Sequence, residues 1–155
     1  MNPTGDELAG IVDLFGALTH DELHRAIVEL AARTDGSTVD RDVVDSWIGE
    51  AQVAYVLVEH PVDGADGYVT GPAAFPTVPP HAEDLPHILD VPRRTVDRES
   101  IATRIEARID DAVAETVATG DTERARELID LSYDAEAWSP VELETQRSTL
   151  GELFE

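Results

Sequence analysis

With 155 residues the chain is long enough for one domain or two small halves, and it has no cysteine for a disulfide framework or a thiolate metal site. Asp and Glu number 33 against 11 Arg and no Lys, which gives a net charge of −22, and the hydrophobic content of 42% argues against a disordered acidic chain. The longest apolar run, Val53 to Val58, is far shorter than the roughly 20 residues of a membrane span, and the N-terminus lacks a signal pattern. These features predict a soluble, cytoplasmic protein without a membrane partner.

Three helices are expected in the first part of the chain. Thr4 with Glu7, and Thr19 with Glu22, form capping-box patterns, and each is followed by apolar residues at helical spacing. The first helix is expected from about Gly5 to Ala17, and the second from Thr19 until Asp35 and Gly36 stop it. Asp40 is the expected N-cap of a third helix, whose inward residues would be Val43, Val44, Trp47, Ile48 and Ala51.

The pattern changes to β-branched and aromatic residues between Val53 and Glu59. Pro61, Gly64 and Gly67 follow, which favours two short strands joined by a turn, although the run could also extend the third helix. Three helices followed by a hairpin is the order of a winged helix. We therefore predict a winged-helix-like half over residues 1–70, with a plain helical bundle as the alternative.

The segment from Tyr68 to Arg94 differs from the rest of the chain. It holds six of the nine prolines, so a regular helix is not expected to pass through it. Apolar residues lie between the prolines, whereas a flexible linker in an acidic protein should be polar. We predict an ordered crossing over residues 71–94 that is buried against the helices, with Phe75, Leu85 and Ile88 as its structural anchors.

Residues 95–155 are expected to form a helical half. Thr95 or Asp97 can cap a long helix that ends at Gly120, and Asp121 can cap the next one. Ser139, Pro140 and Glu142 mark the start of a last, weaker helix. The fold class expected for the whole chain is mostly α (α+β).

The stretches LFGALTHDELHRAIVELA and GPAAFPTVPPHAEDLPHILDVPRR, followed by an acidic helical tail, resemble an uncharacterised protein family of halophilic archaea. The resemblance covers most of the chain and implies a salt-rich cytoplasm, but no functional residues. The charge agrees with it, because −22 exceeds the magnitude of about 2 to 8 that suits a small domain in ordinary buffers. At molar salt the Debye length falls to about 3 Å, which screens such self-repulsion.

Two groups of histidines are possible metal ligands. His20 and His24 stand four residues apart on a helix, but a zincin pattern would place Glu directly after the first His, where Asp21 stands. His81 and His87 lie among the carboxylates of Glu83, Asp84 and Asp90, where local hydrogen bonding is the simpler interpretation. We therefore assign no metal, cofactor or catalytic residue, and a metal-dependent hydrolase remains a distant alternative.

Five of the eleven arginines fall within sixteen residues and form the candidate anion or nucleic-acid patch: Arg93, Arg94, Arg98, Arg104 and Arg108. The alternative is that these side chains pair with neighbouring acids. If DNA contacted the expected third helix, its phosphates would meet mainly Asp42, Asp45 and Glu50, and these negative charges would repel them. The sequence thus predicts a non-enzymatic, salt-adapted protein-interaction module with a protein partner or self-association, and a transcription-associated winged-helix DNA-binding protein is the alternative.

Overall fold

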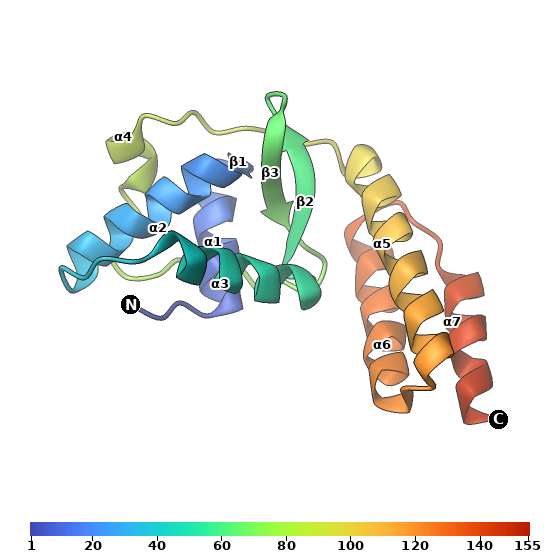
Figure 1. Cartoon of the computed structure of the whole chain (residues 1–155). Helices are drawn as coiled ribbons and strands as arrows, with labels where there is room; N and C mark the ends of the chain where they lie inside the picture. Colours follow the sequence, from blue (N-terminus) through green and yellow to red (C-terminus); the bar gives the residue numbers. More distant parts are fainter. The chain divides into compact units, whose positions relative to one another are not determined.

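The computed structural model describes all residues from Met1 to Glu155 and divides them into two compact units, Met1–Val96 and Asp97–Glu155. The protein is mostly α-helical with one small antiparallel sheet, as predicted. The first unit contains α1 (Gly5–Phe15), β1 (Leu18–Thr19), α2 (His20–Thr34), α3 (Arg41–Val53), β2 (Leu57–Val62), β3 (Ala65–Thr70) and α4 (Leu85–Leu89) (Figure 1). The second unit contains α5 (Arg98–Thr119), α6 (Thr122–Trp138), α7 (Glu144–Gly151) and a final 3₁₀ turn, Glu152–Phe154.

Both predicted capping boxes are present at the starts of α1 and α2. The Thr4 and Thr19 hydroxyls accept from the backbone of Glu7 and Glu22, whose carboxylates accept in return from the cap N–H groups. Helix α1 ends two residues earlier than predicted, because Gly16 adopts φ 81° and turns the chain into β1. This two-residue strand was not predicted, since its pattern is too short to show an alternation.

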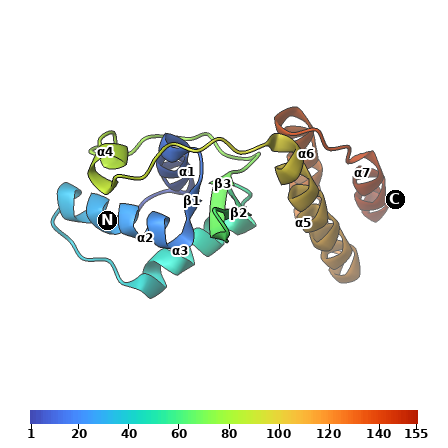
Figure 2. The same cartoon turned by 90° about the horizontal axis from the view of Figure 1, so that it is seen from above.

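The sheet has the strand order β1-β3-β2, and both pairings are antiparallel. Leu18 lies opposite Tyr68, and Leu57 lies opposite Thr70. The helices α1 and α2 lie to one side of the β2-β3 hairpin, and α3 runs past its base and leads into β2 (Figures 1 and 2). The core between them is built from large aliphatic and aromatic side chains that are fully buried, chiefly Leu8, Ile11, Phe15, Leu18, Leu23, Ile27, Leu30, Ile48 and Leu57.

The run from Val53 to Glu59 is divided between a helix end and a strand. Tyr55 has φ 59°, its N–H donates to the Gln52 carbonyl, and the N–H of Val56 donates to Ala51. These two bonds with a left-handed residue form a Schellman motif, which ends α3 and releases the chain into β2. The predicted hairpin is therefore confirmed, and β2 begins at Leu57.

The proline-rich crossing packs within the first unit as an ordered segment, and it contains the short helix α4. The prediction of no helix here is wrong for these five residues, because Pro86 sits in the first turn, where a missing N–H is tolerated. Leu85 is fully buried and Ile88 is half-buried, but Phe75 is 78% exposed, so the prediction that Phe75 is an anchor is wrong. The backbone around Phe75 is held by hydrogen bonds, while the buried side chains of Leu85 and Val91 attach the crossing to the core of the first unit.

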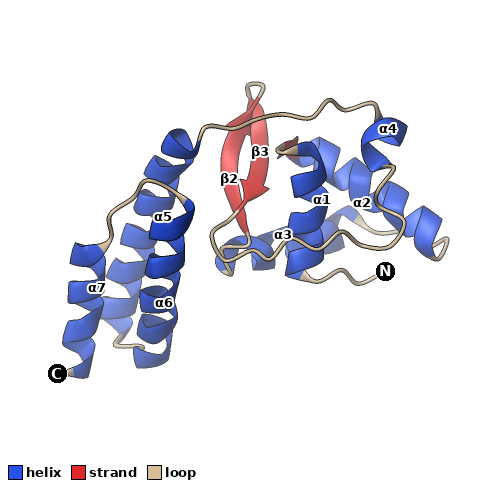
Figure 3. Cartoon of the chain, turned by 180° about the vertical axis from the view of Figure 1, so that it is seen from behind, coloured by secondary structure: helices blue, strands red, loops and turns tan.

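The second unit is a three-helix arrangement in which α5, α6 and α7 each pack on the other two (Figure 3). Asp97 caps α5, Gly120 ends it in the left-handed region, and Asp121 caps α6, all as predicted. Helix α7 begins only at Glu144, because Ser139 is extended and the Leu143 N–H donates to the Glu136 carboxylate. None of the helices combines the length and apolar character that crossing a membrane requires.

Candidate functional site

The five arginines of the predicted patch are divided between the two units and have different surroundings. Arg93 and Arg94 belong to the first unit, and Arg98, Arg104 and Arg108 lie on α5 of the second. The Arg93 guanidinium donates to the carbonyl oxygens of Asp13 and Leu14 at the end of α1. The Arg98 guanidinium lies 4.4 Å from the centre of the Trp138 ring. Arg104 is exposed, and Arg108 is half-buried.

Arg94 clamps three parts of the first unit together. Its Nη1 and Nη2 donate to the two oxygens of Glu22 at 2.7 and 3.0 Å, and its Nε donates to Asp63 in the hairpin turn at 3.0 Å. Nη1 also donates to the Ala17 carbonyl, and the backbone N–H of Arg94 donates to Phe15. The Arg94 and Glu22 side chains are only 16% and 17% exposed. This clamp is structural, so Arg94 is not available to bind an outside anion.

The clamp perturbs the titration of both groups. The hydrogen bonds from Arg94 hold the pKa of Glu22 below its ordinary value, against the opposite effect of partial burial. The same pair raises the pKa of Arg94. A similar pair lies in the second unit, where Arg147 donates to Glu136 at 2.8 Å, stacks on Tyr133 and lowers the pKa of Glu136.

Two glycines let the crossing approach α1. A Cβ placed on Gly10 would lie 2.0 Å from the Thr77 carbonyl oxygen, and one placed on Gly16 would lie 1.8 Å from that of Arg94. No side chain fits at either distance. The backbone of the crossing therefore lies directly against the middle of α1 before α4, and against the C-terminal end of α1 after α4.

The His20 ring bridges α2, α3 and β3. Its Nδ1 lies 2.9 Å from the Tyr68 hydroxyl, and its Nε2 lies 3.0 Å from Asp45. Both ring nitrogens of His20 therefore contact protein side chains, and neither is directed together with His24 toward a shared metal ion. Burial, together with the nearby Glu59, Asp45 and Asp66 carboxylates, raises the pKa of Tyr68 to about 12.

The second histidine group does not converge on a point. His81, Glu83, Asp84, His87 and Asp90 are all exposed around α4. No three His, Asp or Glu side chains anywhere in the chain are placed to share a metal ion.

The clearest exposed apolar feature is the segment Phe75–Val78. Phe75 is the most exposed of the large hydrophobic side chains, and Val78 is also exposed. The backbone beneath them is fixed, because the Phe75 N–H donates to the Asp6 carboxylate and the Thr77 N–H donates to the Asp6 carbonyl. Such a side chain on an ordered backbone is typical of a contact residue rather than of a mobile linker.

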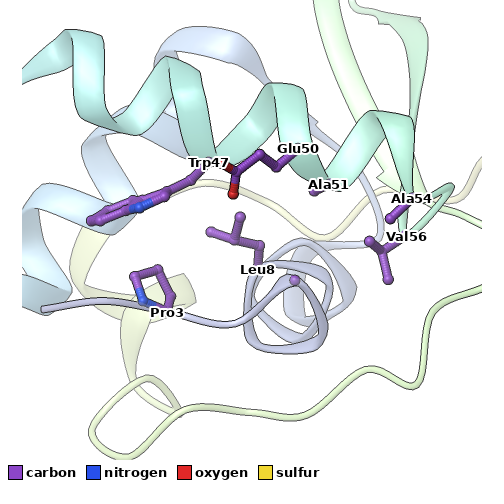
Figure 4. A pocket seen from close by; sticks show the side chains of 8 residues that line it. Pro3, Leu8, Trp47, Glu50, Ala51, Ala54 and Val56 are labelled. Carbon is purple, nitrogen blue, oxygen red and sulfur yellow. The ribbon is translucent and has the colours of Figure 1, made fainter.

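A cavity of about 240 Å³ opens between the N-terminal segment, α1 and the last turns of α3 (Figure 4). Its lining is apolar apart from Glu50, and the side chains that form it come from Pro3, Leu8, Trp47, Glu50, Ala51, Ala54 and Val56. The Schellman turn after α3 shapes one end, since Ala54 and Val56 flank the left-handed Tyr55. This cavity was only partly visible in the sequence, because Trp47 and Ala51 match the inward positions of an ordinary helix.

The outer face of α3 is acidic. Asp42, Asp45 and Glu50 are exposed on it, and the single cation, Arg41, lies 3.9 Å from Asp21. This matches the charge distribution that the sequence predicted for the third helix.

The chain is thus a mostly α-helical protein of two units. Its first unit has a small antiparallel sheet, the exposed segment Phe75–Val78 and an apolar cavity. The model of a family of unknown function, DUF7109, matches residues 6–155, so the chain belongs to that family. No curated protein and no solved structure matches the chain.

Proposed function

We propose that this protein is a non-enzymatic, salt-adapted interaction module of the cytoplasm that binds a protein partner through the segment Phe75–Val78. The observation that carries the proposal is Phe75, a large apolar side chain that is 78% exposed while its own backbone is fixed to Asp6. Keeping this side chain in water costs free energy that a partner would recover, and little conformational entropy remains to be lost on binding.

The arrangement of the first unit supports a winged-helix-type framework. Three helices followed by the β2-β3 hairpin is the element order expected of such a domain, and β1 adds a third strand next to β3. In DNA-binding members of that fold class the third helix enters the major groove, and phosphate contacts need Arg or Lys. Here α3 exposes Asp42, Asp45 and Glu50, and Arg94 is held by Glu22. The surface charge therefore favours a protein partner over DNA.

Salt adaptation follows from charge. The net charge of −22 with no Lys should make the folded chain repel itself in dilute buffer, and molar salt should remove that repulsion. Circular dichroism during a KCl titration is expected to show a cooperative loss of helix as salt is withdrawn. Full helicity in dilute neutral buffer would contradict salt adaptation.

The binding proposal is tested by comparing Phe75→Ala with Val53→Ala, a second exposed apolar residue outside the segment. Both variants are expected to melt like the parent, because neither side chain is buried. Tagged protein purified in molar KCl is expected to co-elute with a stoichiometric partner, or to self-associate, and only Phe75→Ala is expected to lose this. If the Phe75→Ala variant retains the partner, the proposal that the segment Phe75–Val78 binds it is wrong.

DNA binding is the second candidate, favoured only by the element order of the first unit. If the protein binds duplex DNA in a fluorescence anisotropy assay, with an affinity that falls as salt rises, this second candidate is supported. Loss of that binding on substitution of Arg41, at the start of α3, would place the DNA on this helix.

A further inference from the structure

We infer that the cavity between α1 and α3 is a docking site for a basic partner segment, in which an aliphatic or aromatic side chain fills the cavity and a neighbouring Arg or Lys contacts Trp47 and Glu50. The inference rests on the proposed function in assuming a protein partner. It adds a second contact point, distinct from Phe75, and the chemistry of what binds there.

The size of the cavity suits one side chain. Cavities for drug-sized ligands measure about 300 to 1,000 Å³, whereas an engineered cavity of about 150 Å³ in another protein binds benzene. The present cavity of about 240 Å³ lies between these limits and is open to solvent on one side (Figure 4). It can therefore take a leucine or phenylalanine side chain from outside.

The lining chemistry selects a cation next to that anchor. Glu50 is the one charged residue in the lining, and its exposed carboxylate makes no ion pair within the chain. Trp47, one helical turn earlier, is half-buried and offers an aromatic face. A carboxylate and an indole at the mouth of an apolar cavity together attract a guanidinium or ammonium group, by charge and by cation–π attraction.

The attraction between Glu50 and a cation of the partner acts at direct contact, so it persists at high salt. At molar ionic strength the Debye length of about 3 Å leaves only charges in direct contact effective. The distant acids of the chain then contribute little, whereas Glu50 at the cavity mouth still does. Glu50, in direct contact at the cavity mouth, likewise disfavours an acidic partner.

The cavity and Phe75 lie near the same helix turn. Gly5 lines the cavity, and its neighbour Asp6 holds the backbone of Phe75 and Thr77. One partner chain could contact both features, but each can be disabled separately. Ala54 lines the cavity from an exposed position at the end of α3, so Ala54→Leu is expected to fill the cavity without disturbing the core.

The experiment uses the full chain in 2 M KCl and three labelled peptides: one basic with a single Leu or Phe, the same peptide with Ala at that position, and an acidic peptide with the anchor kept. NMR of the Trp47 indole N–H reports on the cavity. The anchored basic peptide is expected to shift this signal saturably, at least 10-fold more tightly than either of the others.

Ala54→Leu is expected to abolish the shift and Glu50→Gln to weaken binding several-fold, while Glu59→Gln, an exposed acid on β2, is the unchanged control. Equal binding of the acidic peptide, or full binding by Ala54→Leu, overturns the inference. So does a Trp47 shift that depends on protein concentration alone, because it would make a second copy the occupant. Phe75→Ala is expected to keep the peptide response, so a failure of the proposed contact at Phe75 is distinguishable from a failure here.

Discussion

Replacing Arg94 with Ala should test the clamp that holds the crossing to the rest of the first unit. The change removes the two-pronged contact with Glu22 and the bond to the Ala17 carbonyl, and it leaves Glu22 mostly buried without its cation. Breaking a fully buried pair in this way costs about 3 to 5 kcal/mol. Both side chains retain some exposure, so we expect the lower end, about 3 kcal/mol. The contact with Asp63 adds little, because that carboxylate is 71% exposed.

For a domain of 60 to 100 residues, about 3 kcal/mol corresponds to a fall in Tm of about 12 to 24 °C. The measurement is thermal unfolding in molar KCl followed through Trp47, with Trp138→Phe as the background so that the first unit is observed alone. Arg93→Ala is the matched control, since it removes an adjacent Arg that only bonds carbonyls at the end of α1 and should cost about 0.3 to 1 kcal/mol. Arg94→Lys should restore little, because Lys cannot make the paired contact.

The pH dependence gives a second readout of the same clamp. The pKa of Glu22 is lowered in the folded state, so its contribution is present above the ordinary value of 4.5 and is lost as pH falls through the lowered pKa. The parent should therefore lose stability in this acid range more steeply than Arg94→Ala. If Arg94→Ala melts within about 1 kcal/mol of Arg93→Ala and shows the parent's acid profile, the clamp does not hold the unit together.

Two further outcomes follow from the structure. Gly10→Ala should cost about 2 kcal/mol or more and speed proteolysis between Gly71 and Leu89, because its Cβ would meet the Thr77 carbonyl, whereas Gly49→Ala, with open space around it, should be neutral or slightly stabilising. Absorbance at 295 nm should show one tyrosine titrating at about pH 12, absent in Tyr68→Phe. Because that pKa is raised, its contribution to stability is present below about pH 10 and is lost between about pH 10 and 12.

The local parts of the fold could be predicted from the sequence. Thr4, Thr19 and Asp121 are caps whose hydrogen bonds reach only three residues along the chain, so their pattern is visible without tertiary information. The hairpin was predictable for the same reason, from a turn between two β-rich runs. Strand β1 was not, since two residues become a strand only because β3 is beside them.

The surface was harder to predict than the core. Phe75 was expected inside because it is large and apolar, but the glycine at position 10 brings the crossing's backbone, and not this side chain, against α1. The surroundings of Arg94 were hard to predict for a related reason: in the sequence Arg94 stands near Arg98, whereas the fold pairs it with Glu22, 72 residues away. Neither the glycine contact nor the long-range pair leaves a periodic signal in the chain.

The position of Arg94 also has a consequence for synthesis. A ribosome releases the N-terminal end first, at about 5 to 20 residues per second, so residues 71–94 emerge about 1 to 5 s after the hairpin is complete. During that interval the apolar surface that Leu85 and Val91 later cover is exposed to water, and Glu22 lacks its partner Arg94. We expect arrested nascent chains with residue 70 outside the ribosome to be cut readily by protease, and those exposing residue 96 to resist it. We therefore expect the first unit to become protected only near the end of its own translation.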